Sequence, residues 1–139
     1  MAMTARKMQI GEVAELCGLS LRTVRYYEEQ GLIEPEARSE GGFRLYTDEQ
    51  VERLRLIRQM KPLGFTVAEM RELLDARELL GSSSAGHKQR ARATERLTEF
   101  SSAAVQRCEE LREQLARAEE FAEALRRETR RAERLARGD

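Results

Sequence analysis

Two arginines and a tyrosine near residue 25 have the types and the spacing to contact DNA. They lie in the segment LRTVRYYEEQ, residues 21–30. On an α-helix, Arg22, Arg25 and Tyr26 occupy positions i, i+3 and i+4, so they share one face. Guanidinium groups suit phosphate oxygens and guanine edges, and a helix N-terminus adds partial positive charge. The segment therefore predicts a DNA-contacting helix face, with Thr23 beside it.

The adjacent Tyr27 is expected to have a different role. We expect it to be semi-buried, with its ring packed against the base of a wing and its hydroxyl still reaching solvent or phosphate. An alternative stays open for the arginines, which is that they only pair with nearby glutamates such as Glu28 and Glu29.

Two short helices would position this face. The segment IGEVAELCGLS has apolar residues at a helical period and ends its helix at Gly18. Ser20 is a suitable N-cap for the second helix, which runs to about Gln30, and Gly31 can supply the left-handed residue after it. A helix, a short turn with glycine and a second helix form a helix-turn-helix pattern.

A small β-hairpin, or wing, is expected next. Pro35 blocks continued helix. Gly41 and Gly42 separate two short segments, 33–38 and 43–46, and the second alternates apolar and polar residues. The glycines therefore form the tip of the wing.

Two further helices are each expected to begin at a capping box. TDEQ, residues 47–50, opens a helix that continues to about Leu63, with Pro62 near its end. TVAE, residues 66–69, opens a second helix that ends near Leu80.

A flexible joint and a long helix complete the predicted organisation. Residues 81–87 contain the joint GSSSAG, and residues 88–137 contain neither glycine nor proline. About 50 helical residues would span roughly 75 Å. We therefore divide the chain into a DNA-binding domain at 8–80, the joint at 81–87 and a dimerisation helix at 88–137.

A heptad repeat in the long helix predicts a partner helix. Its narrow leucine and alanine seam has charged flanks, and a small domain cannot bury it. The seam residues expected to pack in a homodimer are Leu97, Ala104, Cys108, Leu111, Leu115, Ala118, Ala122 and Leu125. A solvated, monomeric helix is the alternative.

Composition limits the other classes of protein. Charged residues make up 36% of the chain and aromatic residues 5%, which is too polar for one compact ball. The formal net charge is zero, so global charge indicates no particular partner. There is no apolar run near 18 residues and no signal-peptide core, so we expect a soluble, cytoplasmic protein without a membrane span.

Catalysis and metal binding find no support in the sequence. The chain has one histidine, His87, and shows neither grouped carboxylates in an apolar setting nor a glycine-rich phosphate loop. Cys17 and Cys108 lie far apart, and each is expected to be a packing residue in a reduced chain. We therefore expect no enzyme activity, no cofactor and no metal.

The motifs resemble those of a known family. IGEVAELCGLSLRTVRYYEEQGLI, followed by GFRLYTDEQVERLRLIRQMKPLGFTVAEMRELL, closely resembles the MerR family of bacterial transcription regulators. The match runs from about Met8 to Leu80, with the signatures R-Y-Y-E-x-x-G-L and G-[FY]-R-x-Y in the family's order. The resemblance implies a mainly α fold: a winged helix-turn-helix domain, a second wing around residues 61–66, and a long antiparallel coiled-coil dimerisation helix.

The resemblance also implies partners. Members bind palindromic operators as homodimers, and many bend and untwist a promoter with an overlong spacer so that RNA polymerase reads both promoter elements. A nucleoid-associated regulator of transcription is therefore expected, with double-stranded DNA as its partner. A coiled-coil adaptor whose winged domain contacts a protein is the alternative from another class.

The residues that match the family's DNA contacts can be named position by position. On the recognition helix and the wings they are Arg22, Thr23, Arg25, Tyr26, Tyr27, Arg38, Arg44, Tyr46 and Lys61. A fold-stabilising role is the alternative for Tyr46. The sequence lacks the cysteine loop that metal-sensing members carry after the dimerisation helix, so we expect either no effector or a small ligand between that helix and the DNA-binding domain.

Overall fold

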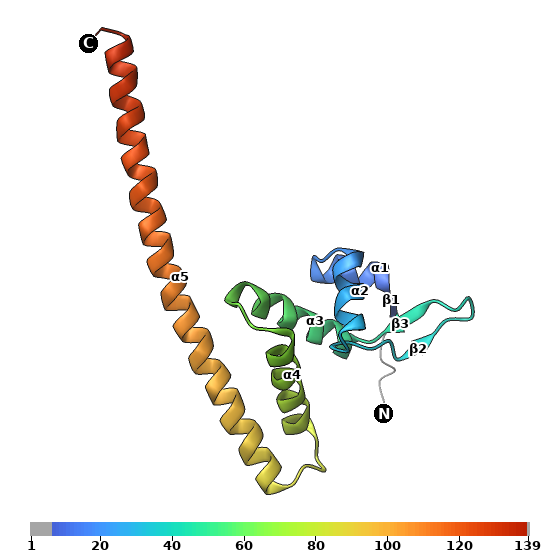
Figure 1. Ribbon diagram of the computed structural model, residues 1–139. Helices are drawn as coiled ribbons and strands as arrows, with labels where there is room; N and C mark the ends of the chain where they lie inside the picture. Colours follow the sequence, from blue (N-terminus) through green and yellow to red (C-terminus); the bar gives the residue numbers. More distant parts are fainter. Residues whose placement is uncertain (1–6, 139) are drawn as a thin grey trace. The chain divides into compact units, whose positions relative to one another are not determined.

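The computed structural model describes residues 7–138 as a mainly α fold with one small sheet (Figure 1). The elements are β1 (Met8–Gln9), α1 (Ile10–Cys17), α2 (Leu21–Glu29), β2 (Ala37–Arg38), β3 (Arg44–Tyr46), α3 (Asp48–Met60), the 3-10 helix η1 (Lys61–Leu63), α4 (Val67–Gly81) and α5 (His87–Ala136). The described residues divide into two compact units, residues 7–99 and 100–138. The predicted fold class is therefore confirmed.

Local signals fix the ends of α1 and α2. Gly18 follows α1 with a φ of 65°, and Gly31 follows α2 with a φ of 76°. At the start of α2, the Ser20 side chain accepts a hydrogen bond from the Thr23 amide at 3.1 Å. These left-handed glycines and this N-cap confirm the predicted helix-turn-helix boundaries.

The sheet has three strands rather than the two of a hairpin. β2 and β3 form the predicted wing, and Figure 1 shows it extending beyond α1 and α2. β1, which was not predicted, adds to the other edge of β3, so that the strand order is β1-β3-β2 with antiparallel pairing throughout. Met8 lies opposite Tyr46, and Arg38 lies opposite Arg44.

The prediction of a capping box at residues 47–50 is wrong. Thr47 is the N-cap of α3, but its side chain forms no cap hydrogen bond. The reason is that the Gln50 side chain accepts from the Glu34 amide at 2.9 Å and so cannot complete the box. The box of Thr66 and Glu69 at the start of α4 is confirmed, with hydrogen bonds of 3.0 and 3.1 Å.

The first unit has one apolar core, to which α1, α2, α3, α4 and the sheet all contribute. Its buried residues are Met8, Val13, Ala14, Cys17, Val24, Tyr27, Leu32, Ile33, Tyr46, Val51, Leu54, Ile57, Met60, Met70 and Leu74. Each large aliphatic side chain buried in this way stabilises the fold by about 1.5–3 kcal/mol relative to an exposed one.

Three arginines from α3 and α4 bond carbonyl groups at or just after the ends of the first two helices. Arg58 donates to the Cys17 carbonyl at 2.8 Å, and Arg53 donates through Nε to the Leu32 carbonyl at 2.9 Å. Arg71 donates to the Gln30 carbonyl. Carbonyls at helix ends lack partners within the helix, so Arg58 and Arg71 supply partners at the ends of α1 and α2, and Arg53 bonds the segment just after α2.

Polar contacts also tie the first turns of α5 to the end of α4. Arg90 donates to the Leu80 carbonyl at 3.1 Å and to the Ser82 carbonyl. Arg96 pairs with Glu72 of α4 at 2.6 Å. The connection at 82–86 is therefore held at both ends. The division into 8–80, 81–87 and 88–137 stays a prediction.

Beyond residue 100, α5 continues as a helix with many apolar side chains exposed. The exposed large ones are Val105, Leu111, Leu115, Phe121, Leu125 and Leu135. Among residues 7–138, no helix is both long and apolar enough to cross a membrane.

Candidate nucleic-acid interface

The exposed face of α2 carries the predicted DNA-contacting side chains. Arg22 and Arg25 are exposed, and Tyr26 retains 43% of its accessible surface. Within residues 7–138, neither arginine forms an ion pair, so the alternative in which they pair with neighbouring glutamates is not found there. We call these three exposed side chains the α2 face.

Thr23 lies at the N-terminal edge of the α2 face. Its hydroxyl and that of Ser20 share a hydrogen bond of 2.8 Å. Its side chain thus takes part in the helix cap, and the residue is only half-exposed. A phosphate contact by Thr23 would have to be made by a hydroxyl already held in place by Ser20.

The expectation of a semi-buried Tyr27 is wrong. The residue retains 2% of its accessible surface and belongs to the core. The reason is geometric, because Val24 and Tyr27 lie three residues apart and both face inward from α2. The ring of Tyr27 packs 5.3 Å from that of Tyr26, centroid to centroid, with the planes tilted by 58°. Tyr27 therefore contacts the α2 face from the core side, through its ring contact with Tyr26.

Tyr46 is fully buried, which favours its fold-stabilising alternative. Its hydroxyl donates to Glu28 Oε2 at 3.0 Å. Burial, together with the hydrogen bond to this carboxylate, raises the pKa of Tyr46 to about 12, and Arg44 and Arg25 partly oppose the rise. The phenol is therefore neutral and serves as a donor between β3 and α2.

Glu28 also holds the wing arginine. Arg44 NH1 donates to the same Glu28 Oε2 at 3.1 Å, and the two side chains are 43% and 14% exposed, respectively. One carboxylate oxygen thus joins α2 to the wing at two points. From the sequence alone, Glu28 is predicted only as a partner of α2 arginines, because its contact with β3 spans 16 residues and leaves no periodic signal.

The remaining predicted contacts lie at the tip of the wing and at the far end of α3. Arg38 is exposed, and its NH1 donates to the Gly42 carbonyl at 3.1 Å, which braces the tip. Phe43 beside it is 61% exposed. Lys61 is exposed at the first residue of η1, after the last turn of α3. The structure thus joins Arg44 to α2 through its ion pair with Glu28, whereas Lys61 lies on a different element, at the start of η1.

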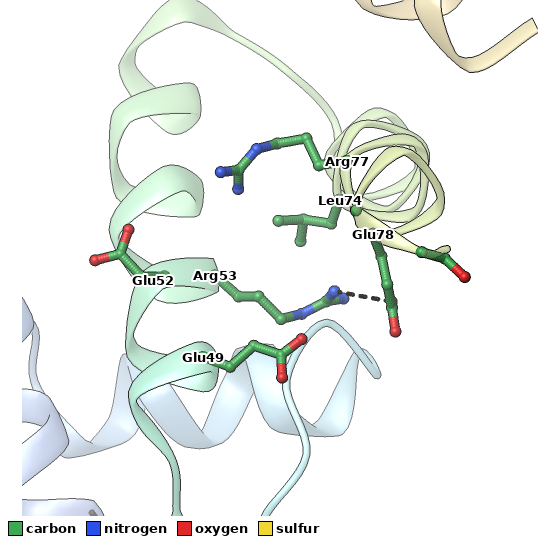
Figure 2. Close-up of a pocket in the computed structure, with 8 residues that line it drawn as sticks. Glu49, Glu52, Arg53, Leu74, Arg77 and Glu78 are labelled. Atoms are coloured by element: carbon green, nitrogen blue, oxygen red, sulfur yellow. Dashed lines mark ion pairs between the residues drawn. The ribbon is translucent and has the colours of Figure 1, made fainter. Parts of the chain in front are cut away.

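A groove lies between α3 and α4, and an ion pair joins the two helices across it. Figure 2 shows Arg53 of α3 beside Glu78 of α4, an ion pair of 3.5 Å, with Arg77 extending from α4 above it. The groove has a volume of about 460 Å³. Its charged lining residues are Glu49, Glu52, Arg53, Arg77 and Glu78. Carboxylates outnumber guanidinium groups there, so the groove does not extend the cationic surface.

The described chain contains no site for a metal ion of the usual kind. Residues 7–138 include no group of three or more His, Cys, Asp and Glu side chains able to hold one. Cys17 is 1% exposed, and its burial raises the pKa of the thiol. Cys108 is half-exposed on α5 and free.

Comparisons with known proteins cover most of this chain. Residues 8–77 match a family model described as MerR HTH family regulatory protein, and residues 51–135 match one described as MerR, DNA binding. The HTH-type transcriptional regulator ZntR of Escherichia coli strain K12 is 48% identical over 69 residues, which are 50% of this chain and 49% of that protein. The match thus spans about half the length of that curated relative.

Solved structures show the same fold over a longer range. A putative MerR family transcriptional regulator from Listeria monocytogenes is 29% identical, with a TM-score of 0.62 over 81% of this chain and 80% of that one. HiNmlR, a MerR family regulator lacking the sensor domain and crystallised bound to promoter DNA, has a TM-score of 0.63 over 85% of this chain and 86% of its own. Its identity is 22%, so this second likeness concerns the fold alone.

Proposed function

The chain belongs to the MerR family of helix-turn-helix regulatory proteins, and we propose from this premise that it is a sequence-specific, DNA-binding regulator of transcription. The observation that carries the proposal is the α2 face, where Arg22 and Arg25 are exposed and form no ion pair within residues 7–138. Arginines presented on a helix can bond guanine O6 and N7 as well as phosphate oxygens.

The wings extend this contact along the DNA backbone. Arg44 lies next to α2 through Glu28, and Arg38 lies opposite Arg44 across the β2–β3 pair. Lys61 at η1 would contact phosphate as a point charge. A chain with zero net charge can therefore bind DNA through a local group of cations.

The active form proposed is a homodimer joined by α5. Leucines at residues 111, 115 and 125 remain 44%, 58% and 46% exposed, and they belong to the predicted heptad seam. Two antiparallel copies would bury this seam, and their twofold axis would give two equivalent α2 faces. A palindromic operator matches that symmetry.

The regulatory step proposed is deformation of the promoter. A dimer bound across an overlong spacer would bend and untwist it, so that RNA polymerase could engage both promoter elements. Such a protein acts on the nucleoid in the cytoplasm. The adaptor alternative is not favoured, because both family models that match describe helix-turn-helix or DNA-binding segments.

Genome-wide footprinting with the purified protein tests the proposal. We expect discrete protected sites with inverted symmetry, located between promoter elements separated by a long spacer. In vitro transcription from one such promoter, with and without the protein, then gives the direction of regulation. A protein that protects no discrete site at any salt concentration contradicts the proposal.

A further inference from the structure

We propose that Glu28 is a positioning residue for DNA binding, which holds the wing arginine Arg44 in the orientation that contacts the phosphate backbone. This inference rests on the proposed function. It concerns an acidic side chain, which simple electrostatics would assign no favourable role in binding a polyanion.

The first argument is the geometry of the shared oxygen. Glu28 Oε2 accepts from Tyr46 at 3.0 Å and from Arg44 NH1 at 3.1 Å. Tyr46 is fully buried and neutral, so its hydroxyl fixes the carboxylate from the core side. The carboxylate, held in this way, fixes one end of the guanidinium of Arg44.

The second argument concerns what Arg44 retains. A guanidinium has five N–H donors in a rigid, planar fork, and only one nitrogen, NH1, bonds Glu28. The Arg44 side chain is 43% exposed, so its other donors remain accessible. Holding one end of a planar fork restricts the direction in which the other end points, which lowers the entropy lost on binding phosphate.

The third argument is burial of the acidic group. The Glu28 side chain is 14% exposed, whereas Glu29 on the same turn is exposed. Glu28 lies between the buried hydroxyl of Tyr46 and the exposed guanidinium of Arg44 rather than on the outer surface. Its repulsion of a phosphate is thereby reduced, while its short contact with Arg44 is retained.

The experiment is a double-mutant cycle on the full-length chain with the operator DNA. Glu28→Ala removes a negative charge from a DNA-binding domain, so repulsion alone predicts tighter binding. If Glu28 positions Arg44, affinity instead falls by about tenfold. In an Arg44→Ala background, the same Glu28→Ala change is expected to leave affinity unchanged or to raise it.

Matched variants separate this role from a structural one. Glu29→Ala removes the same charge from the neighbouring exposed position, and it should leave affinity unchanged or raise it. Glu28→Gln retains an acceptor oxygen and should retain part of the affinity. A Glu28→Ala loss that persists in the Arg44→Ala background would overturn the proposal, because Glu28 would then act without Arg44.

Urea denaturation and wild-type binding complete the test. Urea denaturation at the temperature of the binding assay shows whether each variant is folded, and only folded variants are compared. Tighter binding by Glu28→Ala in the wild-type background would also overturn the proposal. Failure of the wild-type protein to bind any operator would instead reject the proposed function, so the two failures are distinguishable.

Discussion

The guanidinium of Arg58 lies directly over Gly18. A Cβ built on Gly18 would be 2.9 Å from Arg58 NH1, the same atom that donates to the Cys17 carbonyl at 2.8 Å. Gly18 also has a φ of 65°, in the left-handed region. The backbone of the turn between α1 and α2 thus requires glycine, and a side chain there would in addition displace the guanidinium of Arg58.

Gly18→Ala is expected to destabilise the protein by about 1–2 kcal/mol from the backbone conformation alone, and further through displacement of Arg58. Gly11 provides the control, because nothing lies within 4 Å of its Cβ position and it is helical. Gly11→Ala should leave stability unchanged or raise it by up to about 1 kcal/mol. The free energy of unfolding in urea measures both, and equal effects of the two changes would contradict the account.

The second prediction concerns assembly. Leu111→Glu places a charge in the proposed seam of α5 and should shift the protein to monomers, at a cost of several kcal/mol. Gln106→Glu adds the same charge at an exposed position five residues earlier, outside the seam. Sedimentation equilibrium at micromolar concentration should show a monomer for the first variant and a dimer for the second. A wild-type monomer under these conditions would rule out the α5 dimer.

The third prediction separates a base contact from a phosphate contact. Arg22→Ala should weaken operator binding by about 1–3 kcal/mol and relax the preference at one base pair in each half-site. Lys61→Ala should weaken binding to all sequences alike and reduce the slope of log affinity against log salt by about one unit. Titrations at several salt concentrations on operator and random DNA test both. Unchanged affinity in both variants contradicts the interface.

The fourth prediction follows from Tyr46. Its pKa of about 12 in the folded chain exceeds the reference value of 10.0. A raised folded pKa means that the stabilising contribution of the neutral hydroxyl is complete below the unfolded value, and that it is lost as pH rises from 10.0 towards about 12. The stability difference between wild type and Tyr46→Phe should therefore shrink over that range. A difference that stays constant up to about pH 12 would exclude this linkage.

The fifth prediction concerns the two thiols. In the Leu111→Glu variant, which is expected to be monomeric, Cys108 is half-exposed, whereas Cys17 is buried with a raised pKa, so an alkylating reagent should modify Cys108 first in the folded chain. Mass spectrometry after a short exposure should find the adduct on Cys108, and in urea both cysteines should react. Rapid native labelling of Cys17 would mean that α1 opens from the core.

The helix-turn-helix could be predicted from the sequence because its signals are local. Ser20, Gly31 and Thr66 each act within a few residues, and their caps and turn conformations were found where expected. The strand β1 was missed because two residues show no alternation, and its pairing with β3 depends on a distant segment. The capping box predicted at Thr47 does not form for a related reason, since the Gln50 side chain accepts a hydrogen bond from the distant Glu34 amide instead.

In the candidate site, too, the features set by local spacing are predictable from the sequence, and those set by contacts between distant segments are not. The α2 face follows from helical spacing, so Arg22, Arg25 and Tyr26 are predictable from the sequence alone. The burial of Tyr27 follows from the same spacing, since it lies three residues from Val24, whereas the shared bonds of Glu28 depend on where the wing packs. Sequence spacing within one helix carries no information about that packing.

The three arginines that bond carbonyls at or just after the ends of α1 and α2 also make the α2 segment dependent on distant parts of the chain. Arg58, Arg53 and Arg71 lie 41, 21 and 41 residues along the chain from the carbonyls they bond. The segment that carries the α2 face therefore obtains these partners only after α3 and α4 have docked. A peptide ending before Arg71 lacks one of these donors altogether. A fragment that keeps all three bonds therefore extends past α2 and the wing into α4, so the stability of the α2 segment depends on a part of the chain about 40 residues away.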